Sequence, residues 1–165
     1  MSDSDWGVKH SISGWTFAFQ SATVSWGSKK QTSVALSSCE AEIMALSEAA
    51  KECVYLEAFL TELGFKSPSP PPLSVDNTAA RDLAYNPEHH SRTKHIDRRH
   101  FYVRELVEEQ KLVVPFVATA NNMADFFTKP LAGRAFFPMR DRIMNVRPSE
   151  SRGSAKGAYA LGGCA

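Results

Sequence analysis

One long stretch of helical periodicity organises this chain of 165 residues. Apolar residues recur at the spacing of a helix face over residues 43–60, and Gly64 follows as a stop signal. Ser37 and Glu40 stand before them in the arrangement of a capping box. The segment Lys66–Pro72 holds four prolines, which exclude both helix and central strand. We therefore expect one long helix from about Ser37, followed by a linker.

The residues before this helix predict an antiparallel hairpin. Ser11–Phe19 alternates in the manner of a half-buried strand, and Ala22–Trp26 is a second β-rich run. Only Gln20 and Ser21 separate the two runs, which indicates a tight turn.

Short strands and helices alternate after the linker. This order is typical of an α/β fold with some parallel strands. Pro115 favours an edge position for the later strand. The expected elements are strand Leu73–Val75, helix Thr78–Tyr85, helix His95–Gln110, strand Leu112–Val117, helix Asn121–Thr128 and helix Arg134–Met144.

Four carboxylates lie where these elements start or end. They are Asp3, Glu42, Asp76 and Asp125. Brought together by a fold, they would form a cage of oxygen ligands for Mg²⁺. A pair of such ions is a common apparatus for phosphodiester hydrolysis, so the pattern indicates a metal-dependent nuclease.

Two of these positions have neighbours that could replace them. Asp5 lies two residues from Asp3 on the same strand face. Glu40 and Glu42 cannot both face one site, being two apart on a helix, and Glu40 fits the helix cap.

Composition is ordinary for a globular protein, with 43% hydrophobic and 22% charged residues. The formal net charge is only +1, so nothing global indicates nucleic-acid binding. Basic residues do cluster locally, at Lys29 and Lys30 and again between Arg92 and Arg99. Each cluster could contact phosphates or could simply be a solvated face. The three cysteines are not spaced as in zinc-binding or redox motifs, which favours a reducing, intracellular location.

Four blocks of sequence resemble the copia-type retrotransposon ribonuclease H domain. The likeness runs from Ser2 to about Asn145. The blocks, in chain order, are TSVALSSCEAEIMAL from Thr32, VDN from Val75, HSRTKHID from His90 and ADFFTKPL from Ala124.

This resemblance implies a ribonuclease H-like α/β fold with a five-stranded mixed sheet flanked by helices. It implies a domain over residues 1–145 and, together with the polar composition, a disordered tail over residues 146–165. Only Met1 and Ser2 precede Asp3, so we expect the first strand to be truncated at its N-terminal end and Asp3 to lie near a fraying terminus.

The implied activity is hydrolysis of the RNA strand of RNA–DNA hybrids by two Mg²⁺ ions, with Mn²⁺ as a possible substitute. Asp3, Glu42, Asp76 and Asp125 are similar to the catalytic and metal-binding acids. The implied partners are the hybrid and the reverse transcriptase domain of the same Pol polyprotein, with neither a membrane nor a small-molecule cofactor. The location is then a cytoplasmic particle or the nucleus.

Five further residues are candidates for nucleic-acid contact. Ser38 and Asn77 adjoin the predicted metal ligands and could hydrogen-bond the 2′-hydroxyl that distinguishes RNA from DNA. Helix capping is the alternative role for Ser38. Arg92, Lys94 and His95 could contact the hybrid backbone or cap the helix that follows them.

The sequence leaves two other functions open. A truncated first strand favours a catalytically weak or inactive nucleic-acid-binding remnant of such a domain. An integrase-like strand transferase is a third hypothesis, which the early position of Glu42 in the chain disfavours.

Overall fold

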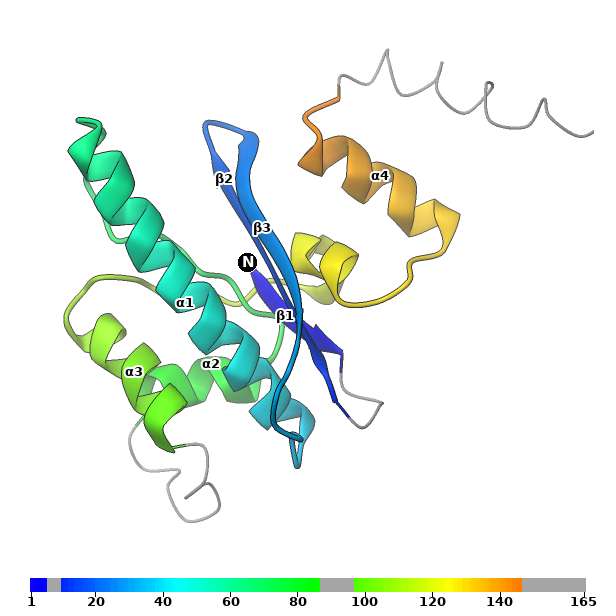
Figure 1. The fold of residues 1–165 in the computed structure, drawn as a ribbon, viewed down its shortest axis with the longest axis horizontal. Helices are drawn as coiled ribbons and strands as arrows, with labels where there is room; N and C mark the ends of the chain where they lie inside the picture. The colour runs from blue at the N-terminus through cyan, green and yellow to red at the C-terminus, as the bar shows by residue number, and fades with distance from the viewer. Residues whose placement is uncertain (6–9, 87–96, 147–165) are drawn as a thin grey trace, which may run out of the picture.

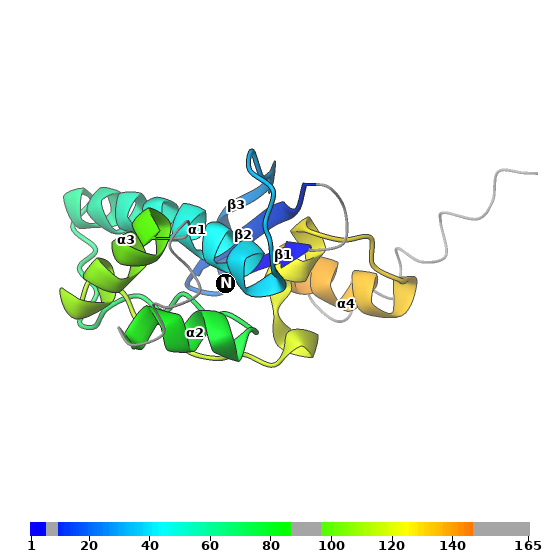
Figure 2. The ribbon, with the colours of Figure 1, turned by 90° about the horizontal axis from the view of Figure 1, so that it is seen from below.

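A computed structural model describes residues 1–5, 10–86 and 97–146 of the chain. Three strands form an antiparallel sheet in the order β1-β2-β3. Figures 1 and 2 show α1, α2 and α3 on one side of this sheet, and α4 on the other side. The elements are β1 (Ser2–Asp5), β2 (Ile12–Phe19), β3 (Ala22–Lys30), α1 (Ser38–Glu62), α2 (Thr78–Tyr85), α3 (Asp97–Glu108), α4 (Gly133–Ile143) and two 3-10 helices, η2 (Thr119–Asn121) and η3 (Met123–Phe127).

The predicted hairpin is confirmed. Gln20 and Ser21 both adopt positive φ angles, 48° and 70°, which is the twist that a two-residue hairpin loop requires. β2 and β3 pair along their whole length, with one irregularity between Phe17 and Ala18.

The predicted five-stranded sheet is not what the structure shows. The described residues form a three-stranded sheet plus two isolated parallel bridges, Pro72 with Val113 and Val75 with Phe116. Four backbone hydrogen bonds join residues 71–75 to residues 113–117, and Ser2 N donates to Ser74 O at 3.0 Å. Prolines in both segments lack an N–H donor, which keeps this pairing short.

The long helix is confirmed, and its start differs in one detail. Ser37 Oγ accepts from Glu40 N at 3.1 Å, as a capping box requires. The Glu40 carboxylate reaches one residue further back and accepts from Leu36 N at 2.6 Å. Gly64 closes the helix with a φ of 87°, a conformation in which glycine carries no steric penalty.

The main core lies between the helices α1 to α3 and the two bridged segments. Helices cover one face of these segments, so alternate residues are fully buried, whereas Val113 and Phe116 are exposed. The buried members of this core are Leu46, Ala49, Ala50, Leu73, Val75, Ala84, Val103, Leu106, Leu112 and Val114. No helix in the described part of the chain has both the length and the apolar character needed to cross a membrane.

The helix expected over residues 121–128 is a pair of 3-10 turns instead. Asn122 is the reason, because its side chain is fully buried and occupied at both ends. Its Nδ2 donates to Ser2 O at 3.0 Å, and its Oδ1 accepts from Ala124 N at 3.2 Å. This ties η3 to β1 and interrupts the α-helical pattern. The last predicted helix is confirmed as α4, with Pro138 inside it.

The short first strand is held along its whole length. Thr16 N donates to Met1 O at 3.1 Å, and Ser2 is fully buried. β1 pairs with β2 on one side and approaches Ser74 on the other. Hydrogen bonds from three segments thus pair the strand that carries Asp3, and fraying of this terminus stays a prediction. Of the predicted tail, residues 147–165 lie outside the described residues.

Candidate metal centre

Three carboxylates from distant parts of the chain meet in one place. Asp3, Glu42 and Asp76 each offer an oxygen within 4.8 Å of the others. They come from β1, from α1 and from the residue after the bridge at Val75. Asp125 lies nearby on η3, and its charge acts on Asp3. Together these four residues form the acid cluster.

Asp3 is held by its neighbours across the sheet. Its side chain is only 3% exposed, and Thr128 Oγ1 donates a short hydrogen bond to Oδ2. Gly14 pairs with Asp3 in the register of β1 and β2. A Cβ on Gly14 would lie 2.6 Å from Thr128 Cγ2 and 3.0 Å from Ala124 O, so only glycine lets η3 approach this closely.

Glu42 is fixed by one residue of β1. Ser4 donates to Oε1 twice, from its backbone N at 3.1 Å and from its hydroxyl at 3.0 Å. Oε2 is buried, and no hydrogen-bond partner for it is present among the described residues. Glu42 therefore keeps one acceptor oxygen without a donor inside the protein.

Asp76 and Asn77 connect the bridged segment to α2. Val75 N and Val75 O both bond to the segment after Val114, which fixes the backbone just before Asp76. Asn77 Oδ1 caps α2 by accepting from Ala80 N at 3.0 Å. The amide oxygen of Asn77 is thus used by the helix, and contact with a 2′-hydroxyl remains a prediction.

Asp125 carries its own counter-ion. Lys129 Nζ lies 2.9 Å from Oδ2, four residues along the chain. Asp125 is 4% exposed, and its Oδ1 is buried without a hydrogen-bond partner in the part of the chain that the structure describes. Asp125, like Glu42, presents one unused acceptor.

Burial and repulsion from neighbouring carboxylates make two of these acids, Asp3 and Glu42, hard to ionise. Burial, reinforced by the charges of Asp125 and Asp76, raises the pKa of Asp3 to about 7, although the Thr128 hydrogen bond and Lys129 oppose the shift. Burial and the charge of Asp3 raise the pKa of Glu42 to about 8, against the two hydrogen bonds from Ser4. Buried like charges are costly unless a cation compensates them.

The donor set fits a hard divalent cation. All the converging ligands are carboxylate oxygens, which Mg²⁺ and Mn²⁺ prefer over nitrogen or sulfur. Two of the buried oxygens lack a donor, and Lys129 is the positive charge that the structure places against Asp125. The arrangement therefore has the ligand chemistry of a site for one or more such cations.

The alternative acids lie elsewhere. The group of three contains Asp3 and not Asp5, and Glu42 and not Glu40. Glu40 is used at the start of α1, as the capping pattern predicted. Ser38 is exposed as the first residue of α1. The remaining candidates for nucleic-acid contact, Arg92, Lys94 and His95, lie outside the described residues.

Sequence reasoning missed the residues that hold the acids. Ser4, Gly14, Thr128 and Lys129 touch or adjoin the cluster, and none was predicted there. One signal was available, because Lys129 follows Asp125 by four residues, the spacing of a helical ion pair. The contacts of Ser4 and Gly14 join segments far apart in sequence, so no local pattern reports them.

The chain is homologous to retrovirus-related Pol polyproteins of plant transposons. It is 40% identical over 128 residues to the polyprotein of transposon TNT 1-94 from Nicotiana tabacum, which covers 78% of this chain and 10% of that protein. It is 38% identical over 154 residues to that of transposon RE1 from Arabidopsis thaliana, which covers 90% of this chain and 10% of the relative.

A shorter similarity concerns a different protein. Secreted RxLR effector protein 161 from Plasmopara viticola is 52% identical over 59 residues, which is 33% of this chain and 42% of that protein. No family model and no solved structure matches the chain. The chain spans about a tenth of the length of the Pol polyproteins it matches.

Proposed function

We propose that this chain is a retrotransposon-derived ribonuclease H domain that hydrolyses the RNA strand of RNA–DNA hybrids with bound Mg²⁺. One observation carries the proposal: carboxylates from β1, α1 and the end of the bridged segment converge within 4.8 Å. The homology to Pol polyproteins agrees with it, because those proteins are retrovirus-related by name.

The residues present fit the metal that this activity needs. Asp3, Glu42, Asp76 and Asp125 would hold the Mg²⁺ ions, and the unused oxygens Glu42 Oε2 and Asp125 Oδ1 are the acceptors that such ions require. When bound, Mg²⁺ supplies Lewis acidity and a water of lowered pKa for attack on the phosphodiester.

Neighbouring side chains hold the carboxylates of the acid cluster in fixed positions. Thr128 orients Asp3, and the two Ser4 donors orient Glu42, so neither carboxylate needs to reorganise when a cation arrives. Lys129 keeps Asp125 in place through Oδ2 and leaves Oδ1 available. Preorganisation of this kind is what separates a working metal site from a loose group of acids.

Cleavage of an end-labelled RNA–DNA hybrid in Mg²⁺ tests the proposal. We expect cut RNA from the wild-type chain and none from Asp76→Asn, which keeps the side-chain shape and removes the charge. Glu40→Gln is the matched control, since Glu40 is buried on the same helix as Glu42 but faces the cap. Equal cleavage by wild type and Asp76→Asn would overturn the assignment.

The same assay separates the proposal from its alternative. A non-catalytic remnant would retain the hybrid in a filter-binding or polarisation measurement without cutting it at any Mg²⁺ concentration. Direct titration of Mg²⁺ by calorimetry adds a readout that does not depend on turnover, and Glu42→Gln should weaken that binding.

A further inference from the structure

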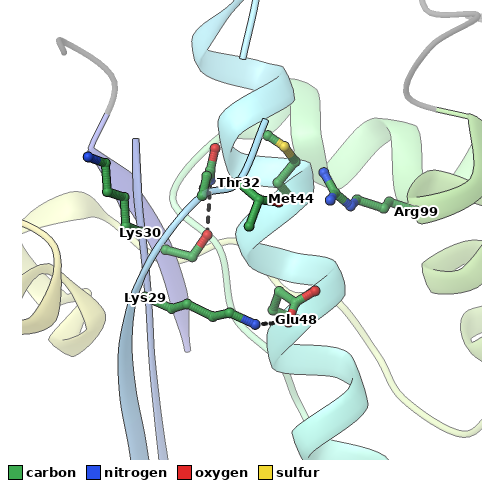
Figure 3. Close-up of a pocket in the computed structure, with 8 residues that line it drawn as sticks. Lys29, Lys30, Thr32, Met44, Glu48 and Arg99 are labelled. Carbon is green, nitrogen blue, oxygen red and sulfur yellow. Dashed lines mark hydrogen bonds and ion pairs between the residues drawn. The ribbon is translucent and has the colours of Figure 1, made fainter. Parts of the chain in front are cut away.

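A second charged site lies at the end of β3, beside the N-terminal half of α1 (Figure 3). Its wall carries three cations, Lys29, Lys30 and Arg99, and one carboxylate, Glu48. Lys29 Nζ lies 3.4 Å from Glu48 Oε2, and Glu48 is also bonded to a lysine outside the pocket. Within the described residues Lys30 has no ion pair. This basic pocket therefore keeps an excess of positive charge.

Gln31 lines the same pocket and carries an unused acceptor. Its Nε2 donates to Ser13 Oγ and to Ala41 O, both at 2.9 Å. A backbone carbonyl only accepts, so the amide nitrogen must face Ala41 and the amide oxygen must face away. Gln31 is 8% exposed, and its Oε1 is buried without a partner among the described residues.

The two features together define the chemistry of a ligand. The lysines and the arginine suit a phosphate, and the buried amide oxygen requires a hydrogen-bond donor close to that phosphate. A ribose phosphate supplies both, through its phosphodiester and its 2′-hydroxyl, whereas a deoxyribose phosphate supplies only the first. We propose that the basic pocket binds one ribose-phosphate unit of an RNA strand, with Gln31 accepting from the 2′-hydroxyl.

The pairing of the three strands links the pocket to the acid cluster. Ser4, which bonds Glu42, pairs with Ser13 on β2, and Ser13 pairs with Lys29 on β3. Two strand spacings of about 4.8 Å separate them. If one RNA strand runs in this direction, a rise of about 3.4 Å per nucleotide puts the bound unit about three nucleotides from the acid cluster. In this form the inference rests on the proposed function, although RNA binding by the pocket can be tested without cleavage.

Binding measured with single 2′-deoxy substitutions along the RNA strand tests the pocket. The protein carries Asp76→Asn so that the hybrid stays intact, and affinity is read by fluorescence polarisation. We expect one position where loss of the hydroxyl weakens binding about five- to tenfold. The double variant Lys29→Ala with Lys30→Ala should weaken binding about tenfold and abolish that positional effect. Lys111→Ala, an exposed lysine paired with Glu109, is the matched control and should bind as the parent does.

Each other outcome overturns the inference. If the deoxy scan is flat while the lysine variant weakens hybrid and DNA duplex equally, the pocket binds phosphate without reading RNA. If the lysine variant binds as the parent does, the pocket is a solvated face. Either result leaves hybrid cleavage by the wild-type chain, and hence the proposed function, untouched. Conversely, a positive scan with a wild-type chain that never cleaves would retain the pocket and reject the nuclease.

Discussion

The acid cluster and the basic pocket lie two strands apart and are built in opposite ways. The acids are nearly all buried, and hydrogen bonds from Ser4 and Thr128 hold two of them rigidly. The lysines of the pocket are exposed, whereas its neutral residues Ser13, Gln31 and Met44 are buried, and two hydrogen bonds fix Gln31. Buried charge destabilises the fold unless a ligand compensates it, whereas exposed charge does not. The comparison therefore separates a site under electrostatic strain from one that binds through accessible side chains.

The largest difference should appear when a single charge is removed from each region. Asp76→Asn or Glu42→Gln should lower hybrid cleavage by at least about 100-fold, because loss of even an outer-shell partner of a metal commonly reduces affinity or activity by about 10- to 100-fold. Lys30→Ala should reduce cleavage far less. Single-turnover rates at saturating protein measure this contrast, and a Lys30→Ala loss as large as that of Asp76→Asn would remove the distinction.

A methyl group at Gly14 tests how tightly the acid cluster is built. Gly14→Ala places Cβ against Thr128 and the backbone of Ala124, so η3 must shift away from β2. We expect a loss of about 1–3 kcal/mol in the free energy of unfolding, as for other overpacked sites, and a marked loss of cleavage.

Gly133→Ala provides the control for this prediction. A Cβ at Gly133 would meet Phe137 at no closer than 3.4 Å, an ordinary contact. Urea titrations of both variants give the unfolding free energies. Wild-type stability in Gly14→Ala would show that η3 is not held against the sheet as described.

Much of this fold follows from local patterns in the sequence. The hairpin through Gln20 and Ser21, the cap at Ser37 and the stop at Gly64 all depend on residues close together in the chain, and all three are confirmed. The expected helix over residues 121–128 failed because the Asn122 side chain bonds to Ser2 O, 120 residues away. No pattern within a window of the sequence contains that contact.

The acid cluster could likewise be predicted only in part from the sequence. Its four carboxylates could be named from the resemblance and from their positions at element ends, and the structure brings three of them within 4.8 Å. The residues that orient them could not, because Ser4 to Glu42 and Thr128 to Asp3 are long-range contacts. The basic pocket was visible only as two adjacent lysines, and its buried acceptor on Gln31 depends on the orientation of one amide.

The strain in the acid cluster should appear in the stability of the metal-free protein. The folded-state pKa values of Asp3 and Glu42, about 7 and 8, lie above the ordinary values of 3.8 and 4.5. The folded state therefore retains protons that the unfolded state has released, and stability falls as pH rises from about 4 to about 8. In EDTA the melting temperature should be several degrees lower at pH 8 than at pH 5, at about 1.4 kcal/mol per pKa unit as an upper bound.

Two variants and one ligand sharpen this result. Glu42→Gln should flatten the pH dependence. Lys30→Ala should leave it unchanged, since Lys30 is exposed and makes no ion pair with the residues that the structure describes. Added Mg²⁺ should raise the melting temperature at pH 8 more than at pH 5, because the cation compensates the ionised carboxylates. A melting temperature that rises with pH in EDTA would contradict the assigned pKa shifts.

The smallest expected effect concerns basic residues whose contribution is electrostatic alone. If Arg92 and Lys94 each contact one phosphate of the hybrid, each releases about one counterion on binding, and the slope of log affinity against log salt should become shallower by about 0.9 for each alanine substitution. The effect of each residue on affinity at one salt concentration is modest, so the slope is the quantity to measure, by polarisation over a range of KCl concentrations in the Asp76→Asn background. The lysines of the basic pocket should change the slope in the same way and, in addition, remove the response to the 2′-hydroxyl. A slope that stays unchanged in Arg92→Ala and Lys94→Ala would show that neither side chain contacts a phosphate of the hybrid.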